Sequence, residues 1–310
     1  MPEILDLKFI TQQKPLVSIC VLTYNHENFV KEAIESFLMQ RVNFDIEIVI
    51  HDDASTDQTQ AILKKYDNDY PNLFKLLLQS ENQKSKLGGG MGPRFNYPRA
   101  KGKYIALCEG DDYWTDPLKL QKQVDFLEGN PEYGICAHKA KQVSELDGSI
   151  NVFPNLKGDK FYTIKDFILA NHIATCSILF KKTSYKYQDW LKKSPFGDWP
   201  LILITMLNSN ERLFVFSQEM SVYRIHSGGV HGKFHQNNYK LSIAYEQHFM
   251  FINLIEKYLL KGKFSKEVCQ KKKITAKKIV SLLSLKKSLH RKSKFSFFYI
   301  YYTLKLRLHN

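Results

Sequence analysis

The sequence predicts an α/β fold with a mostly parallel central sheet, followed by a helical and basic C-terminal extension. Short apolar runs rich in β-branched residues alternate with segments of helical period over the first 130 residues. Polar clusters directly follow three of these runs, and the positive charge is concentrated beyond residue 256. Strand and helix signals that alternate in this way favour parallel strands joined by crossover helices.

The first five elements are predicted in the order of consecutive βαβ units. An apolar run at 16–23 has no helical period and predicts a strand buried on both faces. Apolar residues at helical spacing follow at 30–38, and a second strand is predicted at 46–50. A helix at 58–66 and a third strand at 74–79 complete the series.

Later elements are predicted from shorter signals. A strand at 104–108 precedes a helix for which Thr115 is the expected cap, with Pro117 in the first turn. Further strands are expected at 134–138, 175–180, 213–216 and 221–226.

Length and composition limit the domain organisation. The 310 residues fit one large domain or two modest ones, and we expect a main domain over 1–235 and an extension over 236–310. Residues 1–16 contain acidic side chains and no apolar segment, so no signal peptide is expected. No apolar run reaches the ~18 residues of a membrane span. These features predict a cytoplasmic protein.

Cysteine usage argues against a disulfide framework or a zinc site. The five cysteines are odd in number and contain no C-x-x-C pair. Four of them lie in apolar stretches and are expected to be small core residues in a reducing compartment. These four are Cys20, Cys108, Cys136 and Cys176.

The net charge of +14 belongs to the extension. Residues 257–310 contain 16 Lys or Arg and one acid, Glu267, whereas the other 256 residues contain 29 basic and 30 acidic side chains. The charge therefore bears on where the protein docks, and little on the chemistry of the main domain.

Three polar clusters follow predicted strands. Ligands of open parallel sheets bind beyond the carboxyl ends of the strands, so these clusters are candidate site residues. Each one alone is also compatible with an ordinary polar turn. The clusters are Thr23, Tyr24, Asn25, His26 and Glu27, then Asp52 and Asp53, then Asp111 and Asp112.

The pair Asp111 and Asp112 predicts a divalent metal site. Adjacent carboxylates repel each other unless a cation or hydrogen-bond donors compensate. Mg²⁺ and Mn²⁺ bind through one or two carboxylates and complete their shells with phosphates and water. The alternative is a solvated turn in which an aspartate caps a helix. Neither G-x-G-x-x-G nor G-x-x-x-x-G-K-[ST] occurs, so a metal would have to neutralise any bound phosphates.

Three ordered motifs resemble the nucleotide-sugar half of family-2 glycosyltransferases with the GT-A fold: VSICVLTYNHENFVKEAIESFLMQ, IEIVIHDDASTDQT and AKGKYIALCEGDDYWTDPLKLQKQVDFLE. The resemblance covers residues 16–130, with weaker support to about 230, which leaves 131–235 as the acceptor half. It implies a Rossmann-type sandwich that transfers a sugar from a nucleotide-diphosphate donor to a hydroxyl acceptor in bacterial surface-glycan assembly. UDP is the expected nucleotide, with GDP and dTDP left open.

The resemblance also implies roles for the residues in these motifs. Thr23, Tyr24, Asn25 and Glu27 match the first-strand motif that cradles the nucleotide. Asp53 matches the acid that accepts a hydrogen bond from the base, with Asp52 as its neighbour. Asp112 matches the direct ligand of Mn²⁺ or Mg²⁺, and Asp111 the contact to the ribose or to a metal-bound water. The chain reads PRFNYPRAKG where relatives have A-R-N, so Arg94 or Asn96 takes that role.

The second half supplies the candidate base. Inverting transfer needs a base for the acceptor hydroxyl, well placed and of suitable pKa. Asp198 is an isolated acid before an apolar helical run, and the resemblance places the base at such a helix start; an N-cap role is the alternative. Trp199 is a candidate acceptor platform or a core residue. His226, in the run YRIH, is a candidate for the metal or diphosphate site or a structural histidine.

The extension predicts a membrane-surface contact. Residues 274–289 mix apolar side chains with lysines, and 295–302 are aromatic but too short to span a bilayer. Such segments suit an anionic surface, so we expect peripheral attachment to the inner face of the cytoplasmic membrane, beside a glycan or lipid-linked acceptor. A helical cap or a homodimer surface is the alternative.

Two other functions are compatible with parts of the sequence. A metal-dependent nucleotidyltransferase would share the α/β plan, but its early G-x-G-T-R-type loop is absent. A nucleic-acid-binding protein could use the basic extension. The acidic strand-end clusters would repel nucleic acid, which is therefore not the expected partner.

Overall fold

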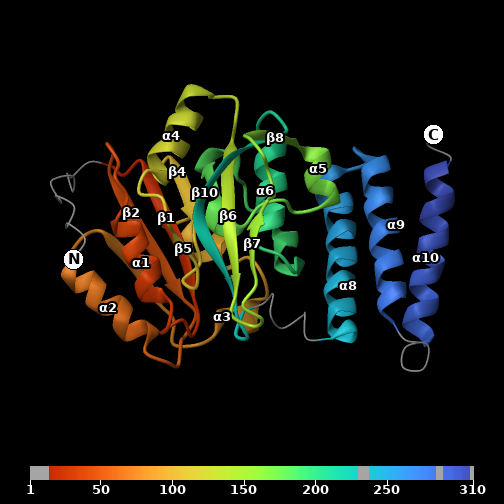
Figure 1. Cartoon of the computed structure of the whole chain (residues 1–310), viewed down its shortest axis with the longest axis horizontal. Coiled ribbons are helices and arrows are strands. Elements are labelled where there is room, and N and C mark those ends of the chain that lie inside the picture. The colour runs from red at the N-terminus through yellow and green to blue at the C-terminus, as the bar shows by residue number, and fades with distance from the viewer. Residues whose placement is uncertain (1–13, 230–236, 284–288, 308–310) are drawn as a thin grey trace.

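A computed structural model describes residues 14–229, 237–283 and 289–307. The ten-stranded sheet has the order β3-β2-β1-β4-β9-β6-β10-β5, with β7 paired to β6 and β8 paired to β10. Figure 1 shows this sheet in the centre of the molecule, with three helices standing side by side at the end opposite the first strands. The segment 1–13, on which the signal-peptide prediction rests, lies outside the described residues.

The first half of the sheet is parallel, as predicted. Strands β3, β2, β1 and β4 are neighbours in this order, and each pair runs parallel. All five predicted elements are present within a few residues of their expected ends. Their bounds are β1 Val17–Thr23, α1 Val30–Leu38, β2 Ile46–Asp52, α2 Thr59–Asp69 and β3 Phe74–Leu78.

The segment that follows β3 contains short helices and an edge strand. Thr115 does not cap α4, because the helix begins four residues later, at Lys119. The Thr115 N–H donates to the Met220 carbonyl, next to the edge pairing of β5 with β10. Leu118 holds the N-cap position instead, without a side-chain bond. The elements are α3 Gln83–Leu87, the π-helical turn η2 Gly92–Asn96, β4 Tyr104–Leu107, β5 Tyr113–Trp114 and α4 Lys119–Gly129.

The second half makes the sheet mixed. Strands β6 and β10 are parallel, while β5, β7, β8 and β9 each join by antiparallel pairing. The two strands predicted at 213–216 and 221–226 are one strand with register shifts, and most of 175–178 is a 3₁₀ turn. The bounds are β6 Ile135–Ser144, β7 Ile150–Phe153, β8 Lys160–Thr163, α5 Ile164–Leu169, η3 Thr175–Ser177, β9 Leu179–Lys181, η4 Lys182–Ser184, η5 Asp189–Lys193, α6 Asp198–Leu207 and β10 Arg212–Ile225.

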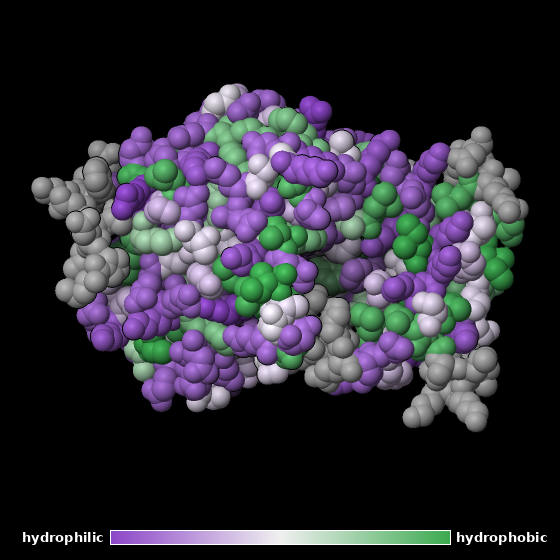
Figure 2. Space-filling view, viewed as in Figure 1, coloured by the Kyte–Doolittle hydropathy of each residue, from purple (hydrophilic) through white to green (hydrophobic). Residues whose placement is uncertain are grey.

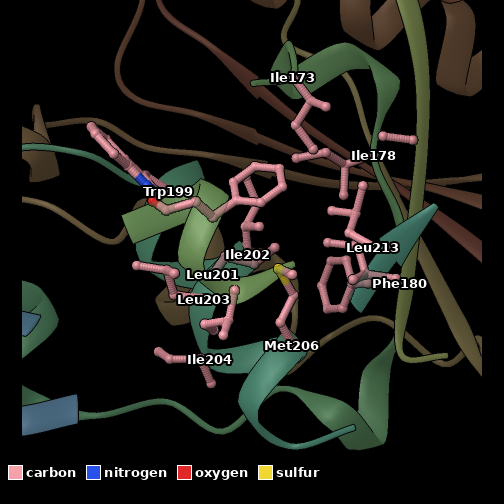
Figure 3. Close-up of a cluster of buried hydrophobic side chains, with 14 of the residues drawn as sticks. Ile173, Ile178, Phe180, Trp199, Leu201, Ile202, Leu203, Ile204, Met206 and Leu213 are labelled. Atoms are coloured by element: carbon pink, nitrogen blue, oxygen red, sulfur yellow. Dashed lines mark hydrogen bonds between the residues drawn. The ribbon is translucent and has the colours of Figure 1, made fainter. Parts of the chain in front are cut away.

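Alternate residues of the strands divide the core between the two faces of the sheet. Ile19 and Ala106 belong to the cluster under α1 and α4, whereas their neighbours Cys20 and Ile105 belong to the cluster under α5 and α6. Figure 3 shows part of the second cluster, in which α6 contributes most of the labelled side chains. All five cysteines are free and buried. Core positions were predicted for four of them, and Cys269 is buried as well.

The C-terminal extension is helical, as predicted, and it packs on the main domain. Phe251 and Ile255 of α8 belong to the same hydrophobic cluster as α6, so the extension shares the core of the domain. No helix in the described ranges combines the length and apolar character that crossing a bilayer requires. The elements are α8 Asn238–Ile255, the π-helical η6 Glu256–Leu260, α9 Ser265–Leu282 and α10 Leu289–Arg307.

Candidate active site

The carboxyl ends of β1, β2 and β4 bring the three predicted clusters to one edge of the sheet. Thr23 and Asp52 are register partners at the ends of β1 and β2. The Gly110 N–H, just beyond β4, donates to the Leu22 carbonyl at 3.0 Å. Clusters separated by up to 90 residues in the sequence therefore lie side by side.

Asp52 organises the loop after β2. Its carboxylate accepts hydrogen bonds from the Thr23 hydroxyl at 2.8 Å, from Gln60 Nε2 at 2.6 Å, and from both the N–H and the hydroxyl of Ser55. These protein donors engage both oxygens of the buried carboxylate.

The loop after β1 is tied to the same segment. Asn25, at a left-handed φ of 56°, donates its N–H to Ser55 Oγ and accepts the Thr56 N–H at its side-chain oxygen. Glu27 Oε2 accepts the N–H of Gln58, the N-cap residue of α2. Asn25 and Glu27 thus brace the two loops, while the neighbouring Tyr24 side chain is 46% exposed and free to contact a ligand.

Asp53 holds the start of α3. Its Oδ1 accepts the Gln83 N–H at 2.6 Å and its Oδ2 accepts the Lys84 N–H at 3.1 Å. A carboxylate beside the first N–H groups of a helix is a stabilising arrangement. The predicted nucleotide-binding acid therefore couples α3 to the strand edge.

Asp111 lies between two histidines. Its Oδ2 is 3.1 Å from His226 Nε2 and 3.6 Å from His26 Nε2. Burial alone would raise the pKa of Asp111, but the His226 hydrogen bond and the charge of His26 hold it below its ordinary value. The Oδ1 atom is buried and has no hydrogen-bond partner.

Asp112 is more deeply buried and is held by backbone. Its Oδ1 accepts the Arg224 N–H at 2.9 Å, and its Oδ2 is buried without a hydrogen-bond partner. Burial, reinforced by the adjacent Asp111 charge, raises the pKa of Asp112 well above its usual range. A buried carboxylate with an unpaired oxygen is in a costly state that a bound cation would relieve.

Arg224 and His26 complete this cluster. His26 lies in the polar cluster that follows β1, but neither residue was among the predicted site residues. The Arg224 guanidinium donates to the Asp111 carbonyl at 2.8 Å, pairs with Glu32, and lies over the Tyr113 ring at 4.4 Å. The YRIH run at the end of β10 was the available signal for Arg224.

A cleft of about 120 Å³ lies beside Glu109, two residues before Asp111. Glu109 and Asp198 both line it, although they come from opposite halves of the chain. Burial, with the charge of Asp111, raises the pKa of Glu109 to about 7. Glu109 was not among the predicted site residues. The sequence feature that could have indicated it is its position two residues before Asp111.

Asp198 is the first residue of α6, where the sequence places it. Its Oδ2 accepts a hydrogen bond from Asn171 Nδ2 at 2.8 Å, and its Oδ1 accepts the Trp199 N–H at 2.7 Å. Burial raises the pKa of Asp198, and these hydrogen bonds offset part of the rise. A half-buried carboxylate facing a cleft, with a raised pKa, suits a general base.

Asn96 lines the same cleft, and Arg94 lies two residues before it in η2. Asn96 Nδ2 donates to the Val21 carbonyl at 2.8 Å, and its Oδ1 is buried without a partner. Arg94 Nη2 donates to the Leu87 carbonyl, and its Nε atom is buried and unpaired. Both side chains therefore keep a polar atom that a ligand could satisfy.

Trp199 does not fit the expected acceptor role. Its ring is buried among the apolar side chains of Figure 3, and its indole N–H donates to the Phe167 carbonyl. The ring packs at 4.8 Å from Phe251 and so presents no open face to a saccharide. The structure agrees with the alternative, a core residue, because α8 covers this face of α6.

The acidic pair suits a hard divalent cation. Asp111 Oδ1 and Asp112 Oδ2 are both buried and unpaired carboxylate oxygens, which is the ligand type that Mn²⁺ and Mg²⁺ prefer. His226 hydrogen-bonds Asp111, and among the described residues no group of three His, Cys, Asp or Glu side chains forms a metal-binding set. The site therefore fits a cation held by two carboxylates, with its remaining coordination positions filled by a bound ligand.

Comparison with known proteins gives one family and a consistent fold. Residues 18–187 match the family model described as Glycosyl transferase family 2. An uncharacterized Mycobacterium tuberculosis protein is 34% identical over 218 residues, which is 69% of this chain and 60% of that protein. The chain thus spans about 60% of the length of this relative.

Two solved structures share the fold. S. aureus TarS 1-349 in complex with UDP-GlcNAc has a TM-score of 0.56 at 18% identity, covering 95% of this chain and 92% of that one. The Pyrobaculum calidifontis mannosyltransferase PcManGT, in complex with GDP-Man and Mn²⁺, has a TM-score of 0.53 at 14% identity, covering 95% and 88%. At these identities the similarity shows the architecture alone.

Proposed function

Because the chain belongs to glycosyl transferase family 2, we propose that it transfers a sugar, with inversion, from a nucleotide-diphosphate donor to a hydroxyl group of a glycan or lipid-linked acceptor. One observation supports this most directly. Asp198 and Glu109 line one cleft, and Asp111 and Asp112, which follow Glu109 at the end of β4, keep unpaired oxygens.

Asp198 is the proposed general base. Its side chain takes the proton of the acceptor hydroxyl as the hydroxyl oxygen bonds to the anomeric carbon. The bond from that carbon to the diphosphate breaks, and its electron pair leaves on the phosphate oxygen. Asn171 and the Trp199 N–H hold the carboxylate in one orientation. A base fixed in this way loses little entropy when the acceptor arrives.

Asp111 and Asp112 are the proposed ligands of Mn²⁺ or Mg²⁺. When bound, such an ion neutralises charge on the donor diphosphate. His226 orients Asp111 by hydrogen bonding to Oδ2, and Arg224 orients Asp112 through its backbone N–H. Outer groups of this kind fix the direction of ligand oxygens. We therefore assign His226 a positioning role and no longer propose it as a metal ligand.

The nucleotide is proposed to lie between the β1 and β2 loops and α3. Tyr24 offers an exposed ring for stacking, Asp53 a carboxylate for the base, and Asn96 and Arg94 their unpaired polar atoms. Thr23, Asn25, Glu27 and Asp52 shape this wall through their mutual hydrogen bonds. A UDP-sugar is the proposed donor.

The acceptor is proposed to be presented at the inner face of the cytoplasmic membrane. The basic extension supports this location, because residues 257–310 carry 16 Lys or Arg against one acid, a charge that attracts anionic lipid. Family membership favours glycosyl transfer over the nucleotidyltransferase and nucleic-acid alternatives.

A thermal-shift panel tests the donor chemistry. UDP-GlcNAc, GDP-mannose and a dTDP-sugar are each compared with and without Mn²⁺, because a ligand of the native state raises its melting temperature. We expect the largest rise with a UDP-sugar, and only when Mn²⁺ is present. The absence of any rise with all three nucleotide sugars would contradict the proposal.

A further inference from the structure

The aromatic segment of α10 has two faces with different environments. Phe295, Phe298 and Tyr302 face inward, where they pack with Phe249 of α8 and Ile279 of α9. Among the apolar residues between 274 and 283 that were predicted to contact a membrane, Ile279 and Leu283 are buried, whereas Ile274 is 52% exposed. Residues 284–288 lie outside the described ranges.

The outer face of α10 has an apolar stripe, defined by Phe297, Ile300, Tyr301 and Leu304. These side chains are 64%, 58%, 46% and 55% exposed. Their spacing of three, four and seven residues places them along one line of the helix. Figure 2 shows hydrophobic residues at this outer edge of the molecule, beyond α9. Isolated exposed apolar residues are common, but four in one stripe are typical of an interaction surface.

The charge around the apolar stripe indicates which kind of partner binds it. The α10 sequence contains five Lys or Arg and no acid, and α9 beside it contains six Lys and one Glu. The single acid, Glu267, pairs with Lys165 of α5. A second copy of the chain would place like charges against like charges, which disfavours self-association through this face. An anionic surface is complementary to it.

We propose that the outer face of α10 docks on an anionic phospholipid surface. The apolar stripe enters the boundary between headgroups and acyl chains, while the exposed Lys294 and its basic neighbours meet lipid phosphates. Docking is independent of the donor chemistry. Only its purpose, which is to bring the cleft to a lipid-linked acceptor, depends on the proposed function.

Vesicle sedimentation tests both halves of this surface. The full chain is mixed with phosphatidylcholine vesicles or with vesicles that also contain phosphatidylglycerol. We expect binding to the anionic vesicles only. The triple variant Phe297→Ser, Ile300→Ser, Leu304→Ser should bind at least about tenfold more weakly, because it loses the apolar insertion. The matched control is Ile150→Ser, which removes an equally exposed isoleucine from β7.

A second pair of variants tests the electrostatic contribution to vesicle binding. Lys294→Glu should weaken binding at least about tenfold at low salt, whereas Lys64→Glu, at an exposed lysine of α2, should not. Equal binding by the triple variant and the wild type would overturn the proposal. So would self-association of the wild type that the triple variant abolishes, because the stripe would then be an interface between copies.

Donor binding separates the two proposals. The thermal shift with UDP-GlcNAc and Mn²⁺ is measured on the same preparations, and circular dichroism checks that each variant is folded. Loss of vesicle binding with an intact donor shift in the triple variant supports docking through α10. A wild-type chain that binds vesicles but shows no thermal shift with any of the three nucleotide sugars would contradict the proposed function and leave the docking surface standing.

Discussion

His226 Nε2 lies 3.1 Å from Asp111 Oδ2, although the two residues are 115 positions apart in the chain. The contact exists because β10 pairs with β5, which immediately follows Asp111 and Asp112. One strand from the second half of the chain thus braces the acidic pair of the first half. Five predictions concern this edge of the sheet and the cleft beside it.

His226→Ala should weaken Mn²⁺-dependent binding of the nucleotide sugar by about ten- to a hundredfold, the usual effect of removing a group that orients a ligand carboxylate. Binding of UDP in the absence of metal should change little. Isothermal titration with and without Mn²⁺ measures both. His172→Ala is the matched control, because this half-buried histidine contacts a backbone carbonyl away from the cleft. Equal losses in the two variants would mean that His226 has only a structural role.

Asp112→Asn should abolish the increase in donor affinity that Mn²⁺ provides, a loss of more than about a hundredfold if both carboxylates bind the ion. Asparagine keeps an oxygen for the Arg224 N–H, so the fold should persist. Asp116→Asn, at an aspartate paired with Lys122, is the control for loss of a nearby charge. Undiminished Mn²⁺ dependence in Asp112→Asn would place the metal elsewhere.

Asp198→Asn should lower turnover by about 10²–10⁴, the usual contribution of a general base, with donor affinity near the wild-type value. Initial rates of nucleotide release at saturating donor and acceptor measure the turnover, and titration measures the donor affinity. Asp189→Asn, an exposed acid in η5, is the control. A variant that keeps most of its turnover would show that the proton is taken by another group, with Glu109 the next candidate in the cleft.

The pH dependence of Asp198 has a definite sign. Burial raises the pKa of this carboxyl in the folded state, so the folded chain binds its proton more readily than the unfolded chain does. The stability contributed by the protonated form is therefore lost as the pH rises from the unfolded to the folded pKa. At neutral pH we expect Asp198→Asn to melt at the same temperature as the wild type or higher. A melting temperature several degrees lower would mean that the ionised carboxylate stabilises the fold.

Gly110→Ala should destabilise the strand edge. A Cβ atom at residue 110 would lie 2.5 Å from Thr23 Cγ2 and 2.9 Å from His26 Nδ1. Overpacking of this kind typically costs about 1–3 kcal/mol. Gly129→Ala is the control, since a Cβ there meets no atom within 4 Å. Chemical denaturation compares the two free energies of unfolding, and equal values would show that the β1 loop moves aside without cost.

Much of the site could be predicted from the sequence because its signals are local. Apolar runs of strand length followed by Thr23, Asp52 and the pair Asp111 and Asp112 indicate where strands end, and parallel strands end at a common edge. The start of α6 at Asp198 was likewise visible in the apolar run that follows it. Glu109 belongs to the same EGDD motif as Asp111 and Asp112, but only its position in the cleft indicates that it is a candidate site residue.

What the sequence by itself determined was the parallel order of β1 to β4 and the acids at their ends, because periodicity and turn chemistry depend on near neighbours. Only the tertiary structure decided that His226 braces Asp111, that Trp199 is covered by α8, and that the aromatic residues of α10 divide into a buried and an exposed face. Those outcomes depend on which strands and helices become neighbours. That choice is made by packing between segments far apart in the chain, where no local pattern records the partner.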